Sequence, residues 1–526
     1  MSYLAPSTSS LQITGIIGQG AKLDDSQWQR CVSLSCDDFL VSKLEHGPLG
    51  NSPHTASIHV LDDDSLLNIF YLYRPAIFDA DEDDGQRFSG GKRWDWERWW
   101  YKLAQVCRRW RILIFGSTSY LGLCLVCTHG TPVEDMLAHS PPLPLVIDYF
   151  EGHRDITAEE EGIIVALGRH DRVRRIRLCV PIPNLQKLIM AINEEYPVME
   201  YLIMWGEGHS TTMLPETFQA PRLRHLTLRG FALPIESRLL TTAVDLITLC
   251  LCMDPSTYFQ PSTLLQWVSL MPQLEMLLVS SLDNHDLERQ FRVVHTPITT
   301  HIALHNLRLF AFGGGSAYLE EVISRITTPR LEKFSIEFYK QLTFSIPRLV
   351  QFMNTTKSLR FDSARFRFAG EQFGAMFYSR EEAQTNVLSI NLRCWRSDMQ
   401  LSSVAQIFNS LSQIFFAVEH LTLEQAEHYH REVNRSEWNK LLRSFSNVKT
   451  LHVEDRLVRE LFRCLKVYNE EYPLGLLPEL QELTCSGSCN ADHITSFVEA
   501  RQNAGRPVTL MCHKHLTPTM SSTSSS

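Results

Sequence analysis

A short motif of apolar residues, called the phrase below, recurs after Arg172 and limits the folds that this chain can adopt. In each copy an apolar residue is followed by two variable residues, a second apolar residue, one variable residue and a third apolar residue. The last two apolar positions lie two residues apart, so they share one face of a strand. Each copy therefore predicts one strand with a buried face. The clearest copies are Val173/Ile176/Leu178, Met199/Leu202/Met204, Leu223/Leu226/Leu228, Leu246/Leu249/Leu251, Leu274/Leu277/Val279, Leu307/Phe310/Phe312 and Leu331/Phe334/Ile336.

Less regular copies follow these. They are Leu359/Phe361, Val387/Ile390/Leu392, Val418/Leu421/Leu423, Val448/Leu451/Val453 and Leu480/Leu483/Cys485. The copies recur at intervals of roughly 23 to 33 residues, in or near the length of leucine-rich-repeat units. A single strand of this kind cannot bury its apolar face until neighbouring units stack on it. The phrases therefore predict a stacked array with an extended surface for binding.

Several segments between the phrases carry apolar residues at helical spacing. They are Leu185/Leu188/Ile189/Ile192, Leu319/Val322/Ile323/Ile326, Val404/Ile407/Phe408/Leu411, Trp438/Leu441/Leu442/Phe445 and Val458/Leu461/Phe462/Leu465. The i, i+3, i+4, i+7 pattern is typical of amphipathic helices. Alternation of strand and helix predicts an α/β fold, in which right-handed crossovers join parallel strands. We expect an irregular leucine-rich-repeat-like solenoid with its parallel sheet on the concave side.

Length and composition agree with an open array. A chain of 526 residues is too long for one compact core, but each repeat contacts only its neighbours. The net charge of −9 argues weakly against a nucleic-acid partner. No apolar stretch is long enough to cross a bilayer, and the first residues lack a secretory signal. The 13 cysteines, an odd number, lie mostly in apolar phrases and suit reduced thiols. We expect a cytoplasmic or nuclear protein without a membrane partner.

A different pattern precedes the array. Aspartates at 62–64 suit a helix N-terminus, and Leu66, Leu67, Ile69 and Phe70 follow within little more than one turn. A second helical pattern places Trp99, Leu103, Val106, Trp110 and Ile114 roughly along one stripe. Helices this short bury little apolar surface by themselves. Part of that surface is therefore expected to meet a partner or the array.

Both patterns resemble the F-box, the small helical module through which substrate receptors dock on the Skp-type adaptor of a cullin-RING ubiquitin ligase. The resemblance is carried by Leu61, Leu66, Leu67, Ile69 and Phe70, followed by Val106-Cys107-Arg108-Arg109-Trp110-Arg111. The whole chain is similar to fungal F-box proteins with a leucine-rich-repeat-like domain. It departs from the family where Asp62 replaces the usual Pro, and where a charged insertion at about 79–96 separates the two halves.

The resemblance implies a non-catalytic substrate-recognition subunit of an SCF-type ubiquitin ligase. Its F-box would dock on the adaptor, and its repeats would bind a target protein of unknown identity. The residues implied for adaptor binding are Leu61, Leu66, Leu67, Ile69, Phe70, Val106 and Trp110, the last two lying partly in the module's own core. Two alternatives stay open. These residues could form only the core of a small helical subdomain, and the chain could be a repeat scaffold without a ligase.

The predicted organisation has four parts. Residues 1–55 are expected to be flexible, and residues 56–118 to form the F-box-like module with its inserted loop. Residues 119–512 should form the solenoid, and residues 513–526 a disordered Ser/Thr-rich tail. Exposed candidates for target contact occupy variable positions of the phrases: Tyr201, Arg224, His225, Glu275, Lys333, His420 and Lys449.

Other chemical signals favour structural interpretations. Cys124 and Cys127 with His129 have metal-like spacing, but the cysteines lie in an apolar run that predicts a buried strand. Gly313-Gly314-Gly315-Ser316 precedes a predicted helix, yet the Walker pattern is missing. A strand-to-helix turn with Ser316 as N-cap is the favoured reading there. Since no hydrolase elbow, metalloprotease helix or dinucleotide fingerprint occurs, we expect no enzyme activity, no cofactor and no metal.

Overall fold

The computed structural model describes most of the chain after residue 60. The described residues are 61–74, 98–128, 131–149, 160–207, 212–253, 257–281, 301–370, 372–380, 386–394, 397–425, 435–454, 457–458, 461–462, 465, 475–486 and 491–513. The predicted N-terminal segment 1–55, the inserted loop at 79–96 and the tail after 513 lie outside them. The chain divides into two compact units, Met1–Val173 and Arg174–Ser526, which are described separately.

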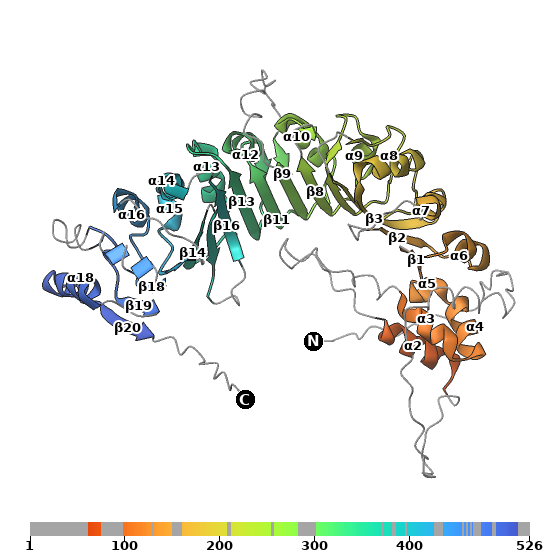
Figure 1. Ribbon diagram of the computed structural model, residues 1–526, viewed down its shortest axis with the longest axis horizontal. Coiled ribbons are helices and arrows are strands. Elements are labelled where there is room, and N and C mark those ends of the chain that lie inside the picture. Colours follow the sequence, from red (N-terminus) through yellow and green to blue (C-terminus); the bar gives the residue numbers. More distant parts are fainter. Residues whose placement is uncertain are drawn as a thin grey trace, which may run out of the picture. The chain divides into compact units, whose positions relative to one another are not determined.

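Between Asp63 and Leu121, the described residues of the first unit form four short helices. Its elements are α2 (Asp63–Tyr73), α3 (Trp99–Val106), α4 (Arg108–Gly116), α5 (Thr118–Leu121), β1 (Leu125–Cys127), α6 (Val133–His139), β2 (Leu145–Tyr149) and α7 (Glu160–Leu167). The Asp62 carboxylate caps α2 by accepting a hydrogen bond from the Ser65 amide at 2.7 Å. Strands β1 and β2 pair in parallel, in register from Leu125 and Leu145. These elements are labelled in Figure 1.

The second predicted helix of this unit is two helices. Cys107 is extended, at φ −159° and ψ 168°, and it ends α3 and caps α4. Its thiol accepts a hydrogen bond from the Trp110 amide at 3.5 Å. The predicted stripe from Trp99 to Ile114 is therefore wrong, because the chain changes direction in its middle. Ile114 is buried, whereas Val106 is exposed.

The second unit is a long, mostly parallel sheet with helices between its strands. Its main strands are β3 (Val173–Pro181), β4 (Tyr201–Glu207), β6 (His225–Arg229), β8 (Thr248–Met253), β9 (Met276–Ser281), β11 (Leu309–Gly314), β13 (Lys333–Tyr339), β14 (Ser363–Ala369), β15 (Gln372–Tyr378), β16 (Asn386–Arg393), β17 (His420–Gln425), β18 (Thr450–Glu454), β19 (Glu482–Ser486) and β20 (Thr509–His513). The helices among its described residues are α8 (Ile182–Ala191), α9 (Arg238–Thr242), α10 (Pro261–Ser269), α12 (Ser316–Ile323), α13 (Pro347–Thr355), α14 (Ser397–Ser410), α15 (Ser412–Phe415), α16 (Arg435–Leu442) and α18 (Ala491–Asn503). Two small parallel ladders pair β5 (Thr212–Met213) with β7 (Phe231–Ala232), and β10 (Ile302–Ala303) with β12 (Ile326–Thr327).

The strand order follows the chain over most of this unit. It runs β3-β4-β6-β8-β9-β11-β13-β16-β15-β14-β17-β18-β19-β20. Apolar positions of successive phrases share a register, as Leu226 with Leu249 and Leu277 with Phe310. All four side chains are buried. Helices α10, α12 and α13 lie on the convex side of the curved sheet (Figure 1). The prediction of an α/β repeat solenoid with a parallel sheet is confirmed.

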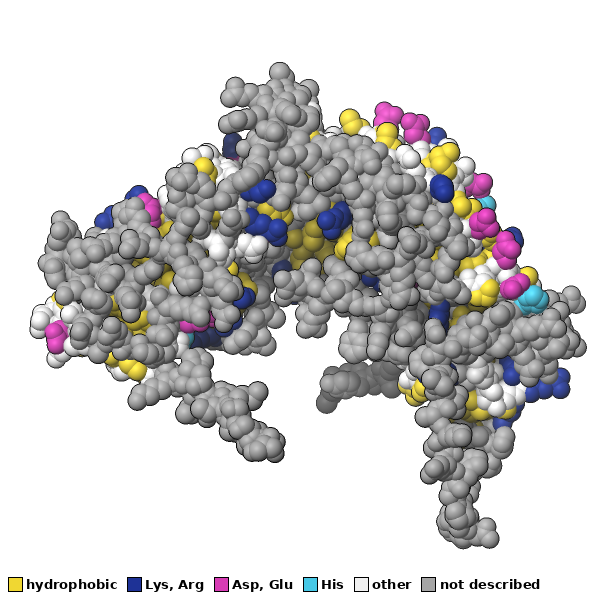
Figure 2. Space-filling view, viewed as in Figure 1, with side chains coloured by type: hydrophobic (Ala, Val, Ile, Leu, Met, Phe, Trp, Pro, Cys, Tyr) yellow, Lys and Arg dark blue, Asp and Glu magenta, His cyan; other side chains and the backbone are white. Residues whose placement is uncertain are grey.

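Each strand presents one face to the helices and the other away from them. In β13, Phe334, Ile336 and Phe338 are buried, while the alternating Lys333 and Glu337 are half-buried. We call the side opposite the helices the outer face of the sheet. Among the described residues, which are coloured by side-chain type in Figure 2, Lys and Arg side chains lie beside hydrophobic ones. The apolar core lies between sheet and helices, and the outer face is left for other contacts.

A three-stranded meander interrupts the parallel order. Strand β15 is antiparallel to both neighbours, while β14 pairs in parallel with β17 and β16 with β13. The predicted strand at Leu359 and Phe361 is wrong, since β14 starts after it at Ser363. Gly370 adopts φ +51° between β14 and β15, a conformation that glycine tolerates in a tight connection. The degenerate phrase thus marks a hairpin rather than a further repeat.

The turn before α12 also differs from its prediction. The helix begins at Ser316 with Gly315 as N-cap, and no side chain of the N-cap residue closes it. Instead the side chain of Gln341 accepts a hydrogen bond from the Ser316 amide at 2.9 Å and donates one to its hydroxyl at 2.6 Å. Ser316 is therefore not the N-cap, because a glutamine distant in sequence satisfies the first amide of the helix. Among the described helices, none has the length and apolarity that a membrane span requires.

Candidate protein-interaction surfaces

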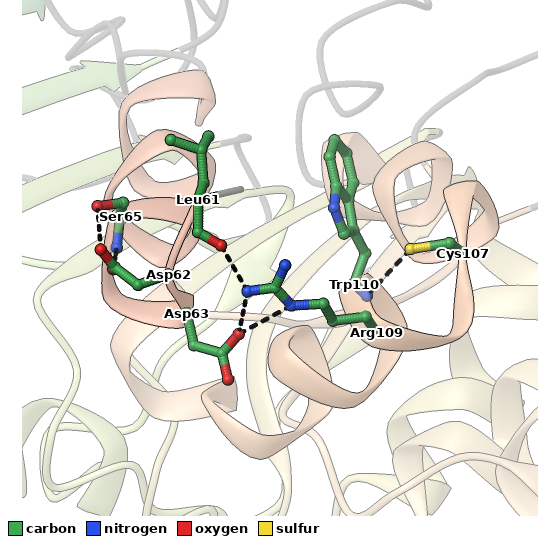
Figure 3. Close-up of polar contacts among 7 residues, drawn as sticks. All are labelled: Leu61, Asp62, Asp63, Ser65, Cys107, Arg109 and Trp110. Atoms are coloured by element: carbon green, nitrogen blue, oxygen red, sulfur yellow. Dashed lines mark hydrogen bonds and ion pairs between the residues drawn. The ribbon is translucent and has the colours of Figure 1, made fainter. Parts of the chain in front are cut away.

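Arg109 joins the two halves of the motif in the first unit. Its Nη2 donates to the Leu61 carbonyl oxygen at 2.6 Å, as Figure 3 shows. Its Nη2 and Nε also donate to Asp63 Oδ1, at 2.6 Å and 3.0 Å. The start of α2 and the start of α4 therefore lie together, despite the residues between them in sequence. Both charged side chains are partly exposed, so the ion pair contributes little to the stability of the module. Its main effect is to hold α2 and α4 in their relative positions.

Aromatic rings and buried leucine form the inside of this module. The rings of Phe70 and Trp110 meet edge to face, with centroids 4.8 Å apart. Leu66 and Trp100 are buried, and the Trp100 indole donates to the Cys124 carbonyl oxygen at 3.3 Å. Edge-to-face pairs of this kind contribute about 0.5–1.5 kcal/mol beyond the area that they bury. Helices α2, α3 and α4 thus share a small folded core.

The seven residues predicted to bind an adaptor differ in their burial. Leu66 and Phe70 point into the core just described. Leu61, Leu67 and Trp110 are half-buried, and Ile69 and Val106 are exposed. Val106 therefore lies at the surface, although the sequence placed it partly in the core, because α3 ends there. A direct contact by Leu66 or Phe70 would require the core to open.

Further apolar side chains of the same helices are exposed. Leu72 on α2 is 80% exposed and Ile112 on α4 is 61% exposed. Together with Ile69 and Val106 they form what we call the module apolar set. Sequence reasoning missed Leu72 and Ile112, although Leu72 follows Ile69 at helical i+3 spacing. These exposed aliphatic side chains are the apolar groups that the module offers to a partner.

The outer face of the second unit changes character along the strands. Across β8, β9 and β11 the register aligns Cys250, Leu278 and Ala311, all half-buried. Across β16 and β14 the outward side chains include Arg393 and Arg367, both exposed. We call the outward side chains of β8, β9 and β11 the apolar strip, and those of β16 and β14 the basic strip. Both belong to one continuous sheet.

A polar cluster stands where these strips meet. The Tyr339 hydroxyl lies 3.2 Å from Ser280 Oγ and donates to Glu337 Oε2 at 3.1 Å. Arg393 Nε donates to Glu337 Oε1 at 2.5 Å, and its guanidinium carbon lies 5.4 Å from the centre of the Tyr339 ring. Burial, with a further contribution from the Glu337 carboxylate, raises the pKa of Tyr339 to about 12. The phenol is thus neutral at physiological pH. We call Ser280, Glu337, Tyr339 and Arg393 the central cluster.

Gly313 makes room for this cluster on the neighbouring strand. A Cβ atom at Gly313 would lie 2.6 Å from the Tyr339 hydroxyl oxygen and 2.9 Å from Ser280 Oγ. We expect Gly313→Ala to displace Tyr339 and to lower the free energy of unfolding by about 1–3 kcal/mol. Urea unfolding followed by circular dichroism measures the loss. Gly116→Ala is the control, since a Cβ there meets nothing within 4 Å. Equal effects of both changes would contradict the steric argument.

Other candidates from the sequence also lie on the strands. Tyr201 and His225 on neighbouring strands have ring centroids 5.6 Å apart, and His225 Nδ1 lies 3.1 Å from Thr248 Oγ1. The same arrangement recurs later, where His420 Nδ1 lies 2.6 Å from Thr450 Oγ1. Such contacts join adjacent repeats through their side chains.

The cysteine motif of the first unit is part of its interior. Cys124 and Cys127 are buried, and His129 lies outside the described residues. Burial raises the pKa of the Cys127 thiol to about 12, which keeps it protonated. Within the described residues, no group of three or more His, Cys, Asp or Glu side chains is arranged to hold a metal ion.

Comparisons with known proteins concern the fold. No family model and no curated protein matches the chain. The crystal structure of a TLR13–ssRNA13 complex is similar at 12% identity and a TM-score of 0.28, covering 74% of this chain and 49% of that one. This chain thus spans about half the length of that protein. The leucine-rich repeat-containing protein LegL7 from Legionella pneumophila is similar at 11% identity and a TM-score of 0.21, covering 63% and 91%. At these scores the repeat solenoid rests on the strand order and register of this chain itself.

Proposed function

We propose that this protein is the substrate-recognition subunit of an SCF-type ubiquitin ligase. In this proposal the helices of the first unit dock on a Skp-type adaptor, and through it on a cullin-RING ligase. The repeat array of the second unit binds the target protein. The protein positions the target and performs no chemistry, so it needs no nucleophile, cofactor or metal. It would act in the cytoplasm, the nucleus or both.

The observation that carries the proposal is the module apolar set. Its side chains belong to helices that already pack around a core formed by other residues. These side chains are therefore exposed although the module has a folded core. Burying a large aliphatic side chain on a partner contributes about 1.5–3 kcal/mol. Side chains such as Leu72 and Ile112 can therefore enter an apolar groove, as amphipathic helices do in helix-in-groove complexes.

The resemblance to the F-box supports the same assignment. The basic Arg108-Arg109 pair and Trp110 belong to its more specific half. Arg109 bonds Leu61 in the other half, and Trp110 packs on Phe70. Both contacts cross the insertion, so the departures at Asp62 and in the inserted loop leave the two halves in contact.

Co-purification tests this function directly. Tagged full-length protein should retain a co-expressed Skp-type adaptor, and Ile69→Asp or Leu72→Asp should abolish retention, because a carboxylate cannot enter an apolar groove without a partner. Met213→Asp is the matched control, since Met213 is also exposed but lies in the second unit. It should leave retention unchanged.

Two results would contradict the proposal. One is a folded wild-type protein that never retains the adaptor. The other is equal retention by the wild type and by both aspartate variants. Either result would favour the alternative, a repeat scaffold that assembles proteins without a ligase.

A further inference from the structure

We infer that the outer face from β9 to β14 binds an extended, acidic segment of the target polypeptide that carries an apolar residue next to its acidic part. This inference rests on the proposed target-binding role of the repeat array. It does not depend on adaptor docking. The partner class follows from the side chains that this face presents and from their charge.

The apolar part of the face lies on β9 and β11. Met276 and Leu309 are register partners, as are Leu278 and Ala311 one pleat further along. All four are half-buried, so they still offer apolar surface to a ligand. An apolar ligand side chain placed across these two strands would leave water, and each of its CH₂ groups buried there contributes about 0.8 kcal/mol.

The charged part of the face follows on β13, β16 and β14. Its outward cations are Lys333, Arg393, Arg365 and Arg367. Arg393 pairs with Glu337 on β13, and Arg365 pairs with Glu424 on β17 at 3.3 Å. Four cations thus face two carboxylates among these side chains. The excess of positive charge favours a ligand with carboxylates.

The central cluster supplies hydrogen-bonding groups between the two parts. The Tyr339 hydroxyl is held in place by Ser280 and Glu337, and Asn391 follows on the next strand with its amide directed to Ser389 Oγ at 3.2 Å. Tyrosine and arginine are enriched among residues that dominate binding energy at protein interfaces. Because Tyr339 is already fixed, little conformational entropy remains to be lost when a ligand binds.

Strand spacing sets the length of the ligand. Strand β11 is separated from β14 by β13, β16 and β15, which makes four steps in the sheet. Steps of about 4.8 Å place the apolar strip roughly 19 Å from the Arg365 and Arg367 strand. An extended peptide advances about 3.3 Å per residue, so its apolar anchor and its acidic end should lie about six residues apart.

The charge of the next strands limits the basic strip. On β17, β18 and β19 the outward side chains include Glu424, Glu454 and Glu482. Outward positions of these strands carry histidine, threonine, serine and glutamate, and neither lysine nor arginine. The acidic part of the ligand should therefore end near β14, because like charges would oppose its extension.

Selection of peptides against the full-length protein tests the inference. A phage-displayed library of random peptides of about 12 residues is long enough to span both strips. We expect enrichment of acidic peptides with an apolar residue about six positions from the acidic end. The affinity of a selected, fluorescently labelled peptide is then measured by anisotropy and should fall at high salt.

Charge reversal identifies the site. Arg367→Glu and Arg393→Glu should each weaken the selected peptide about tenfold or more. Arg238→Glu is the control, because Arg238 is exposed but lies on helix α9. Leu278→Asp should weaken the same peptide through the apolar strip. Circular dichroism of each variant separates lost binding from lost folding. Arg367 is exposed, so we expect Arg367→Glu to leave the fold intact.

Three outcomes would overturn the inference. They are failure to enrich any peptide, enrichment of basic or uncharged peptides, and equal weakening by Arg367→Glu and Arg238→Glu. Peptide binding is measured without an adaptor. Loss of peptide binding with intact adaptor retention would therefore refute this inference alone, and the reverse result would refute adaptor docking alone.

Discussion

Phe366→Ala is expected to lower the free energy of unfolding of the second unit by about 3–5 kcal/mol, the range for loss of a fully buried phenylalanine ring. Phe366 lies on β14 and is 0% exposed. Its ring centroid is 5.1 Å from that of Phe408 on α14 and 5.3 Å from that of Phe445 after α16. It also meets Phe373 on β15 at 5.5 Å. One ring thus joins the meander to helix α14 and to the segment that follows α16.

The cost should be large because the neighbours are also rings that cannot collapse into the cavity. Phe377, Phe408 and Phe415 stack on one another, with centroids 4.7 Å to 6.1 Å apart. Rigid neighbours leave more of the cavity open, and the cost of a large-to-small change grows with cavity volume. In a repeat array, a gap in one unit also weakens its interface with the next.

Phe416→Ala is the matched control for this prediction. Phe416 follows α15 and is 60% exposed, so its loss should change the free energy of unfolding by about 0.5 kcal/mol or less. Urea unfolding followed by circular dichroism compares the two variants. If Phe366→Ala were no more destabilising than Phe416→Ala, the packing of the meander on α14 and α16 would be refuted.

Leu66→Ala and Leu72→Ala, a pair on one helix, should differ in their effect on the stability of the first unit. Leu66 is 0% exposed, so its truncation should cost about 2–5 kcal/mol of stability. Leu72 is mostly exposed, so its truncation should leave stability nearly unchanged. Adaptor affinity should fall in both variants, by unfolding in the first and by loss of contact in the second.

Hydrogen exchange resolved to peptides of 61–74 and 98–116 separates these effects. Leu66→Ala should accelerate exchange throughout both segments, whereas Leu72→Ala should not. Titration of the adaptor then reports the contact. Equal exchange rates in the two variants would contradict the placement of Leu66 in the core, and unaltered adaptor affinity of Leu72→Ala would remove Leu72 from the docking surface.

The sequence predicted the repeats because their signal is strong and local. The phrase fixes which residues face the helices, as the buried Phe334 and Ile336 of β13 illustrate. Several helices followed from the same reasoning, including α14, where Val404, Ile407 and Phe408 are buried as their spacing predicted. Both features depend on burial of one face, which a single sequence displays directly.

The meander escaped prediction because its alternation also fits a repeat strand. Phe366 and Phe368 on β14, and Phe373 and Phe377 on β15, alternate as any half-buried strand does. Only the pairing across Gly370 distinguishes a hairpin from two successive repeats. The break at Cys107 escaped for a similar reason, since an extended cysteine between Val106 and Arg108 has no sequence signal of its own.

The central cluster was beyond sequence reasoning for another reason. Ser280, Glu337 and Arg393 come from three strands and meet only because β9, β13 and β16 lie close together in the sheet. Gly313 gave no hint of its role, because the space that it leaves is filled by a tyrosine from the next strand. Binding sites on a stacked sheet are made by register, and register between distant repeats is a property of the fold.

Hydrogen exchange of the full-length protein with and without the Skp-type adaptor tests the central claim most directly. Adaptor should slow exchange in residues 61–74 and 98–116, where Ile69, Leu72, Val106 and Ile112 lie, and should leave strands β4 to β20 unchanged. Unaltered exchange in both segments at saturating adaptor, or slowing confined to the strands of the second unit, would contradict it.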